Sequence, residues 1–279
     1  SFNGWEVNGV TGVTSVAAGG TFTMPSNNVT LTAQWIDASN EARIGSTPYA
    51  TFAAALADAA DGTIVLLKNI NVASQIEIAA GVTATIDLNG YTIAYTGSTT
   101  LTSGVILVHN GATLTISDSS DPSTGAVDAG DKAYAAIALT KAGDDASNPA
   151  TLTINGGTFT GYYYAITGHG SRHNTVITIN GGTFTATATN DNLAIYHPQN
   201  GTLTINGGTF TGYNTAIEMR AGTLVINDGT FTATAATFSC NANGSGTTTE
   251  GAAIAIAQHT TNKQIAASVT GAASPFRTR

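Results

Sequence analysis

The sequence predicts an all-β protein, a right-handed parallel β-helix made of stacked coils. Three observations support this prediction: a repeated phrase, an alternating pattern within it, and a second short apolar run between its copies. The phrase LTINGGTFT occupies residues 152–160 and returns in similar form at 176–185, 203–211 and 224–232. Its asparagines at 155, 180, 206 and 227 are 25, 26 and 21 residues apart. A unit this short buries no core of its own, so successive copies are expected to stack.

Within each copy, apolar residues alternate with polar ones. Thr153 lies between Leu152 and Ile154, which is the period of a strand with one buried face. Asn-Gly-Gly at 155–157 interrupts the strand, because glycine tolerates positive φ and lets the backbone turn a corner. The second apolar run ends in isoleucine and recurs at 135–137, 164–166, 193–195, 215–217 and 252–254. Each coil is therefore expected to hold at least two strands joined by bends.

Stacking at about 4.8 Å per coil places equivalent residues in columns. We expect the phenylalanines of the repeats to stack inside, with Tyr91 as their counterpart in an earlier coil. We expect the asparagines to stack amide to amide at one corner, and the Thr-x-Thr pairs to form a flat hydroxyl strip outside. The expected members are Phe159, Phe184, Phe210 and Phe231 for the inner column, and 158/160, 183/185, 209/211 and 230/232 for the strip.

Residues 1–36 are predicted to form a small β unit that precedes the solenoid of residues 37–279. The unit opens with FNGW at 2–5 and closes with TFTMP at 21–25 and VTLTAQW at 29–35. These phrases resemble the end of the internalin B-type (Listeria–Bacteroides) repeat of bacterial cell-surface proteins. The start of such a repeat is missing or shortened in this sequence.

A short α-helix at about 47–60 is predicted between a linker at 36–46 and the first coil. Thr47 followed by Pro48 has the pattern of an N-cap and a proline at the first helical position. Phe52 and Leu56 recur at helical spacing through an alanine-rich run,. Because the exposed strand edge of a first coil invites aggregation, we expect this helix to cap it.

Composition narrows the possible functions. Charged residues make up 9% of the chain, against about 25% in typical soluble domains. Nine Lys and Arg and a net charge of −8 argue against nucleic acid binding, which relies on basic patches. No apolar run is long enough for membrane insertion. We expect a monomer.

Metal and thiol chemistry are not indicated. The single cysteine, Cys240, cannot form an internal disulfide, and no Cys/His spacing typical of a metal site occurs,. Acidic residues in the inserted loops at 118–131 and 144–145 match no recognised calcium loop and are expected to be solvated. We therefore predict no cofactor and no metal.

From the expected helix to the C-terminus, the repeated TINGGTF phrase resembles the pectate-lyase-like right-handed parallel β-helix, particularly the TINGGTF-repeat surface proteins of gut-type bacteria. The resemblance implies an extracellular location, at the cell surface or secreted. It does not imply one activity, since that superfamily contains lyases, glycoside hydrolases and adhesins, and a fold alone does not select among them.

Polar and aromatic residues cluster after the second apolar run of three adjacent coils. If these coils stack, tyrosines can pack on the apolar face of a sugar, while Arg, His and Glu bind hydroxyl or carboxylate groups. Equivalent stretches of other coils hold alanine and leucine. The candidate ligand-binding residues are Tyr164, His169, Arg172, His173, Tyr196, His197, Glu218 and Arg220.

We expect an adhesin or binding protein that recognises a glycan or a host surface protein without turnover. The main alternative is a carbohydrate-active enzyme, either a polysaccharide lyase or a glycoside hydrolase, that uses the same patch. A lyase would use His197 or Tyr196 as the base and Arg220 as the neutralising group. Hydrolysis needs two carboxylates, and Glu218 is alone in the central coils. We assign no catalytic residue.

Two other interpretations stay open. One is that the patch is an ordinary solvated surface. The other is ice binding by the Thr-x-Thr strip, although coils of unequal length would disturb the flat lattice match that ice binding requires.

Overall fold

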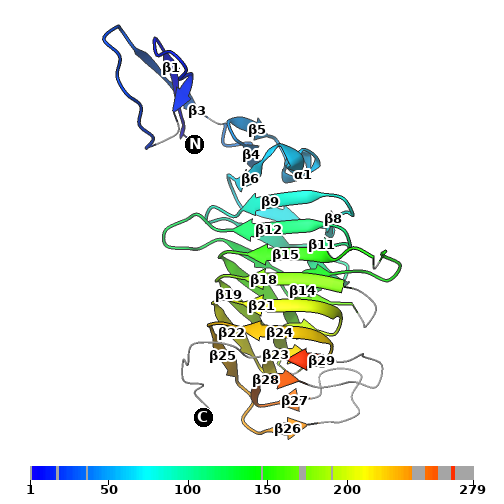
Figure 1. Ribbon diagram of the computed structural model, residues 1–279. Helices are drawn as coiled ribbons and strands as arrows, with labels where there is room; N and C mark the ends of the chain where they lie inside the picture. Colours follow the sequence, from blue (N-terminus) through cyan, green and yellow to red (C-terminus); the bar gives the residue numbers. More distant parts are fainter. Residues whose placement is uncertain are drawn as a thin grey trace.

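The structure is a parallel β-solenoid in which successive coils add strands to three sheets (Figure 1). It is a computed structural model that describes residues 2–16, 19–35, 37–145, 147–169, 174–189, 191–240, 249–256 and 265–267. Strands of successive coils pair in parallel, and each strand keeps its register with the next. The stack of coils predicted from the repeated phrase is therefore confirmed.

The largest sheet has ten strands and is called the ten-stranded sheet. Its strands, in spatial order, are β29 (Ile265–Ala267), β24 (Gly222–Ile226), β21 (Asn200–Ile205), β18 (Asn174–Ile179), β15 (Ala150–Ile154), β12 (Thr113–Ser117), β9 (Thr83–Asp87), β6 (Thr63–Leu66), β4 (Ala42–Ile44) and β5 (Thr47–Tyr49). The last two strands pair antiparallel, β4 with β6 and β5 with β4. The coils therefore begin at β6.

The other two large sheets have seven strands each. The phenylalanine sheet consists of β25 (Thr230–Ala233), β22 (Thr209–Gly212), β19 (Thr183–Ala186), β16 (Thr158–Gly161), β13 (Ala126–Asp128), β10 (Thr92–Tyr95) and β7 (Ile70–Val72). The isoleucine sheet consists of β28 (Ala252–Ile256), β23 (Thr215–Met219), β20 (Leu193–His197), β17 (Tyr164–Gly168), β14 (Ala133–Leu139), β11 (Leu101–Val108) and β8 (Ile76–Ile78). A complete coil thus has three strands rather than the minimum of two.

The core is one continuous apolar column, because strand residues alternate between the two faces of each sheet,. In the isoleucine sheet, Ile106 pairs with Ile137, and the column continues through Ile166, Ile195 and Ile217. These five side chains are at most 1% exposed. The predicted second strand of each coil is confirmed by this column.

The phenylalanine column also forms as predicted. Phe159, Phe184, Phe210 and Phe231 stack with ring centroids 5.2, 4.7 and 5.1 Å apart and nearly parallel planes. The prediction for Tyr91 is wrong, since Ile93 and Val127 occupy this column in the earlier coils. Seven positions separate Ile86 from Ile93, whereas five separate Ile154 from Phe159. The longer turn moves Tyr91 out of register.

The asparagine ladder is confirmed at the corner between the ten-stranded and phenylalanine sheets. Each asparagine donates its side-chain N–H to the amide oxygen of the one before it, along Asn155, Asn180, Asn206 and Asn227. The three N···O distances are 2.8, 2.8 and 2.7 Å. Gly157, two residues beyond Asn155, has φ of 97°, as expected for a residue that turns a corner.

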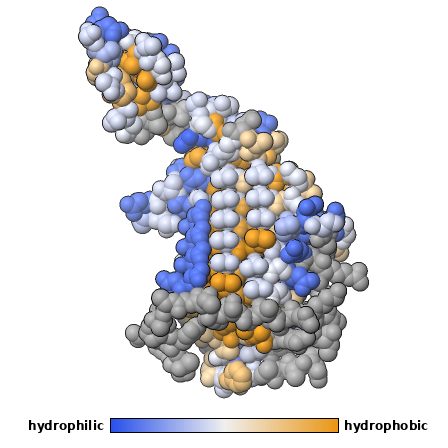
Figure 2. Space-filling model, viewed as in Figure 1, coloured by the Kyte–Doolittle hydropathy of each residue, from blue (hydrophilic) through white to orange (hydrophobic). Residues whose placement is uncertain are grey.

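Threonines line the outer faces of two sheets. The predicted strip on the phenylalanine sheet stays in register from Thr158 and Thr160 to the last coil. The ten-stranded sheet has a second set, in which Thr83, Thr113 and Thr151 pair from coil to coil. Figure 2 shows this second face as two even columns of near-neutral residues beside a hydrophilic column.

The helix is shorter than predicted. The α-helix α1 spans Phe52–Ala57, and the 3₁₀ helix η1 spans Ala59–Asp61. Thr51 is the N-cap, and its Oγ1 accepts a hydrogen bond from the backbone N–H of Ala54. The N-cap prediction for Thr47 is wrong, because Thr47–Tyr49 pairs with β4 as β5. Strand β4 itself lies in the stretch predicted to be a linker. Its pairing with β5 and β6 holds residues 47–49 in a strand, although the local sequence pattern there favours a helix start.

The N-terminal unit is a three-stranded antiparallel sheet in the order β2 (Ser15–Val16), β1 (Phe2–Asn8) and β3 (Thr30–Trp35). Phe2 packs edge-on against Trp5 and Trp35, with centroids 5.2 Å apart in each case. Figure 1 shows this sheet beyond the β4–β5 end of the solenoid. At the opposite end, β26 (Ser239–Cys240) and β27 (Thr249–Glu250) form an antiparallel pair.

Candidate ligand-binding groove

A groove of about 350 Å³ lies on the outer face of the isoleucine sheet. Its floor is formed by the residues that directly follow the buried isoleucines and so point the opposite way. These residues pair in register across four coils, as Leu107, Ala138, Thr167 and Tyr196. Tyr134 and Tyr164 complete an aromatic lining. The central coils thus present a concave surface at the place where the sequence predicted a patch.

Five tyrosines form one connected cluster at this groove. The rings of Tyr164 and Tyr196 are stacked, with centroids 5.3 Å apart and planes at 20°. Tyr163 contacts Tyr164, Tyr162 and Tyr134 with centroid separations of 6.1, 4.6 and 4.9 Å. All five tyrosines are partly exposed. Such a cluster offers rigid aromatic faces and phenolic hydroxyl groups to a ligand.

Glu218 and Arg220 lie beside Tyr196 in the next coil, where Glu218 pairs with Tyr196 in register. Arg220 Nε donates to Glu218 Oε1 at 2.5 Å, and the two side chains are 1% and 0% exposed respectively. The guanidinium carbon lies 5.2 Å from the centroid of the Tyr196 ring, a cation–π contact,. In this arrangement the pair positions Tyr196 and is not open to solvent.

The hydroxyl groups of both stacked tyrosines stay protonated over the physiological range. Burial raises the pKa of Tyr164, and the neighbouring Tyr196 and Glu218 raise it further. Burial also raises the pKa of Tyr196, although the nearby Arg220 partly opposes this. Both tyrosines can therefore donate hydrogen bonds to a ligand, and neither is suited to act as a base at neutral pH.

His197 lies inside the solenoid. It is fully buried, pairs with Met219 across the sheet, and points to the same face as Ile195,. Its Nε2 is 3.2 Å from Thr175 Oγ1, and its Nδ1 is 3.2 Å from the carbonyl oxygen of Ala221. Burial lowers the pKa of His197 to about 4. A ligand in the groove therefore does not reach this imidazole, and its expected place in the patch is corrected.

The remaining candidates divide between the groove and the part of the chain that is not described. His169 is exposed and lines the groove together with Tyr164 and Tyr196. Arg172 and His173 lie outside the described residues. Of the eight candidates, three line the groove, two form the buried pair beside Tyr196, one is internal, and two are not described.

Several lining residues were not predicted from the sequence. Tyr134 belongs to a coil whose second apolar run looked unremarkable, and Lys141 belongs to an inserted loop. Gln75, Thr102 and Ser103 come from earlier coils. Aligning the coils on the isoleucine column would have found Leu107 and Ala138, because they precede Thr167 and Tyr196 in register. The lining by inserted loops has no such periodic signal.

Two basic side chains, Lys141 and His169, are among the described residues that line the groove. Lys141 Nζ lies 3.6 Å from Glu77 Oε1, and both side chains are about half exposed. An ion pair this exposed is weak, worth about 0–1 kcal/mol. Lys141 can therefore exchange this partner for a ligand group at little cost.

Among the described residues, no three His, Cys, Asp or Glu side chains come close enough together to hold a metal ion. No helix in the described part of the chain is both long and apolar enough to cross a membrane.

Comparisons with protein-family models, with curated proteins and with solved structures gave no match to this chain. The class of protein is therefore defined by its architecture, a parallel β-solenoid with a tyrosine-lined groove on one outer face.

Proposed function

We propose that this protein is an extracellular binding protein or adhesin that recognises a glycan in the tyrosine-lined groove, without turnover. The single observation that supports this proposal is the stacked pair Tyr164–Tyr196 on the groove surface. Sugar rings have apolar faces that pack on aromatic rings, and their hydroxyl groups require closely placed donors and acceptors. The groove supplies both, through its tyrosines and through Gln75, Thr102 and Thr167.

A glycan suits the groove better than a host surface protein, which is the other ligand class expected from the sequence. A concave site of about 350 Å³ falls in the range of roughly 300–1,000 Å³ typical of small-ligand sites. Protein partners instead bury about 800 Å² per side over broad surfaces.

Binding without turnover is favoured over catalysis. Both ring nitrogens of His197 are engaged inside the solenoid, so it is not available as the base of a lyase. Glu218 is held by Arg220 beneath the surface. The described lining residues include no carboxylate, so the groove lacks the pair of flanking carboxylates that hydrolysis requires,.

The finer features of the architecture belong to the same proposal. We propose that the coil is right-handed, that α1 caps its first coil, and that the chain divides into residues 1–36 and 37–279. Contacts of α1 with β4, β5 and β6 support the capping role. A cell-surface or secreted location follows from the resemblance of the repeated phrase to bacterial surface proteins.

A glycan array followed by calorimetric titration of the best ligand tests the function. We expect Tyr196→Ala and Tyr134→Ala each to weaken binding about ten-fold or more, as the loss of a central aromatic contact typically does. Tyr213→Ala is the matched control, because Tyr213 is 36% exposed and does not line the groove. This variant is expected to bind like the parent protein.

Three results would reject the proposal. One is the absence of glycan binding by the parent protein. Another is unchanged affinity in both groove variants, provided that their thermal unfolding matches that of the parent. The third is consumption of the bound glycan, which would move the protein to the enzyme class.

A further inference from the structure

The loop between β14 and β15 spans residues 140–149, and its first residues form one wall of the groove. The same corner takes only residues 109–112 in the preceding coil and 198–199 in a later one. Thr140, Lys141 and Ala142, which we call the lip, line the groove. The described residues of this loop form no strand, so contacts other than a strand ladder must fix the position of the lip.

Thr140, the first residue of the lip, has a backbone conformation that needs support from its surroundings. Its φ is 67°, which lies in the left-handed region and is unfavourable for a β-branched residue. Residues held in such conformations persist where the surrounding structure fixes them, and they are common at ligand-binding sites. The contacts that hold the lip in place are therefore part of what shapes the groove.

The carboxylate of Asp144 joins the lip to the preceding coil. Its Oδ2 accepts hydrogen bonds from the backbone N–H groups of Lys141 and Asn110, at 3.0 and 3.1 Å, and its Oδ1 lies 2.8 Å from His109 Nδ1. The Asp144 side chain is 12% exposed, so the expectation that residues 144–145 are solvated is wrong for Asp144. We call Asp144 and His109 together the anchor.

The anchor holds in both charge states of His109. Burial raises the pKa of Asp144, but the hydrogen bonds from His109 and the backbone outweigh it and lower this pKa. The ionised carboxylate only accepts hydrogen bonds, so neutral His109 has its proton on Nδ1. Its Nε2 lies 3.7 Å from Glu77 Oε2, and Glu77 Oε1 lies 3.6 Å from Lys141 Nζ. A second proton on His109 would therefore face Glu77 and leave the bond to Asp144 intact.

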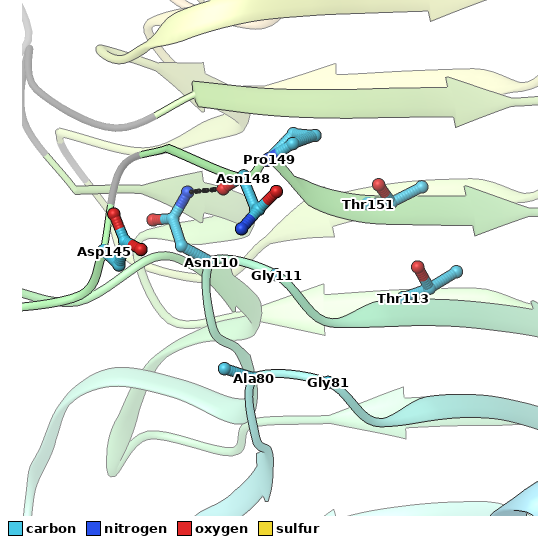
Figure 3. A pocket seen from close by; sticks show the side chains of 9 residues that line it. All are labelled: Ala80, Gly81, Asn110, Gly111, Thr113, Asp145, Asn148, Pro149 and Thr151. Carbon is cyan, nitrogen blue, oxygen red and sulfur yellow. Dashed lines mark hydrogen bonds between the residues drawn. The ribbon is translucent and has the colours of Figure 1, made fainter.

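The far end of the loop is attached to the same corner (Figure 3). Asn110 Nδ2 donates to the carbonyl oxygen of Asn148 at 2.7 Å. Asp145 is exposed, and its carboxylate accepts from the backbone N–H and the hydroxyl group of Ser147 within the loop. A pocket of about 380 Å³ is lined both by this loop and by corner residues of earlier coils. Polar attachments rather than apolar packing therefore hold the loop on this side.

We propose that Asp144 is a positioning residue of the groove, which together with His109 holds the lip in the conformation that lines the glycan site. This inference rests on the proposed function, since it gives the lip a role in glycan binding. Asp144 is not among the described lining residues, whereas the three residues of the lip are. Loosening the anchor therefore weakens binding without removing a side chain that contacts the glycan.

Asp144→Asn is the main test, and Asp145→Asn is the matched control, because each removes one negative charge from the same loop. In Asp144→Asn the amide oxygen can keep both backbone N–H groups only if the NH₂ group faces His109 Nδ1, which must then accept. A neutral imidazole can accept, but a charged one cannot. Histidine gains its charge between about pH 8 and 5, so the anchor of this variant is expected to weaken as the pH falls over this range. The anchor of the parent protein is expected not to change.

Hydrogen exchange of the full chain, followed by mass spectrometry, measures the anchor without a ligand. We expect the backbone amides of residues 140–145 to exchange about ten-fold faster or more in Asp144→Asn than in the parent at pH 5.5, because a hydrogen bond to a charged group is lost. The difference is expected to be smaller at pH 7.5. Asp145→Asn is expected to exchange like the parent at both pH values. Unchanged exchange in β12 and β15 shows that each variant is folded.

Glycan binding is measured at the same two pH values on an array of immobilised neutral and acidic oligosaccharides. We expect Asp144→Asn to bind at least about three-fold more weakly than the parent at pH 5.5, because a smaller fraction of the molecules has the lip in place. The loss is expected to be smaller at pH 7.5. Asp145→Asn is expected to bind like the parent.

The anchor is refuted if exchange of residues 140–145 in Asp144→Asn matches that of the parent, or if it is accelerated equally at both pH values. The positioning role is refuted if the loop loses its protection while binding to the array is unchanged. A parent protein that binds no glycan would instead reject the proposed function, since the exchange experiment decides on the anchor by itself.

Discussion

At the scale of single residues, His197 illustrates how position within a strand decides chemistry. Tyr196 faces the groove, and its neighbour His197 faces the core, because adjacent strand residues point to opposite faces,. Inside, Thr175 Oγ1 links the imidazole to the Gln199 side chain, whose Nε2 donates to it at 3.2 Å. The result is a small polar cluster within an otherwise apolar column.

The buried imidazole predicts a dependence of stability on pH. Its pKa of about 4 lies below the ordinary 6.5 because burial disfavours the charged form. The unfolded chain therefore binds a proton that the folded chain refuses, and stability is fully present above pH 6.5 and falls as the pH drops from 6.5 toward 4. The loss is about 3 kcal/mol if His197 acts alone. Urea unfolding at pH 7, 5.5 and 4.5 measures it.

A His197→Met variant is the companion measurement, since Met219 occupies the next position in this column. The variant is expected to be less stable at pH 7, where the hydrogen bonds to His197 are lost, and to show a flatter decline between pH 6.5 and 4.5. An equally steep decline in the variant would assign the effect to other groups. Burial raises the pKa of Asp118 and Asp144, but their hydrogen bonds outweigh it and lower both pKa values below 3.8. The stability that these two carboxylates contribute to the fold is therefore lost only at a lower pH than the contribution of His197.

At the scale of elements, the solenoid is held by columns rather than by isolated contacts. The phenylalanine column fills the interior behind the Asn-Gly-Gly corner, and the asparagine ladder joins the same corners outside. The two middle asparagines, Asn180 and Asn206, each donate one ladder hydrogen bond and accept one, so they are bonded on both sides. Columns of this kind couple each coil to its two neighbours.

The position of a residue in its column predicts the cost of removing it. Phe210 is 0% exposed and stacks between two rings, whereas Phe231 is partly exposed at the end of the column. We expect Phe210→Ala to lower the free energy of unfolding by about 3–5 kcal/mol, through lost burial and a cavity. Phe231→Ala is the matched control and should cost clearly less. Chemical denaturation compares them, and equal losses would contradict a stacked column.

At the scale of the whole molecule, the N-terminal sheet and the solenoid are joined in sequence but separate in their strand pairing. In the described part of the chain, β1, β2 and β3 pair only with one another. A unit of this size buries too little surface to be strongly stable alone. Both tryptophans of the protein, Trp5 and Trp35, belong to it, and they are 37% and 71% exposed.

This arrangement predicts two separable unfolding transitions. Tryptophan fluorescence reports only the N-terminal sheet, while far-UV circular dichroism is dominated by the solenoid. We expect the fluorescence transition at lower temperature, and we expect a chain lacking residues 1–36 to keep the dichroism transition within about 2 °C, because each coil depends on its nearest neighbours. Coincident transitions, or a large loss of Tm on deletion, would show that the sheet and solenoid unfold as one unit.

The groove depends on a segment inserted between coils. Lys141 and Ala142 reach it from the loop after β14. Regular coils supply the floor of the groove through the outward column that includes Thr167 and Tyr196. Regular strands therefore position this site, and the irregular loop completes it.

The sequence by itself determined the stacked coils and the phenylalanine and asparagine columns. It also determined that Tyr164, Tyr196 and Glu218 lie in three adjacent coils. It could do so because a fixed period brings equal residues together and an alternation of two marks the buried face. Only the tertiary structure decided that His197 points inward and that Ile93 takes the position predicted for Tyr91. It alone joined Tyr134 to the groove and left the Asn110 amide oxygen buried without a hydrogen-bond partner among the described residues. These features depend on turn lengths and loop paths, which have no period in the sequence.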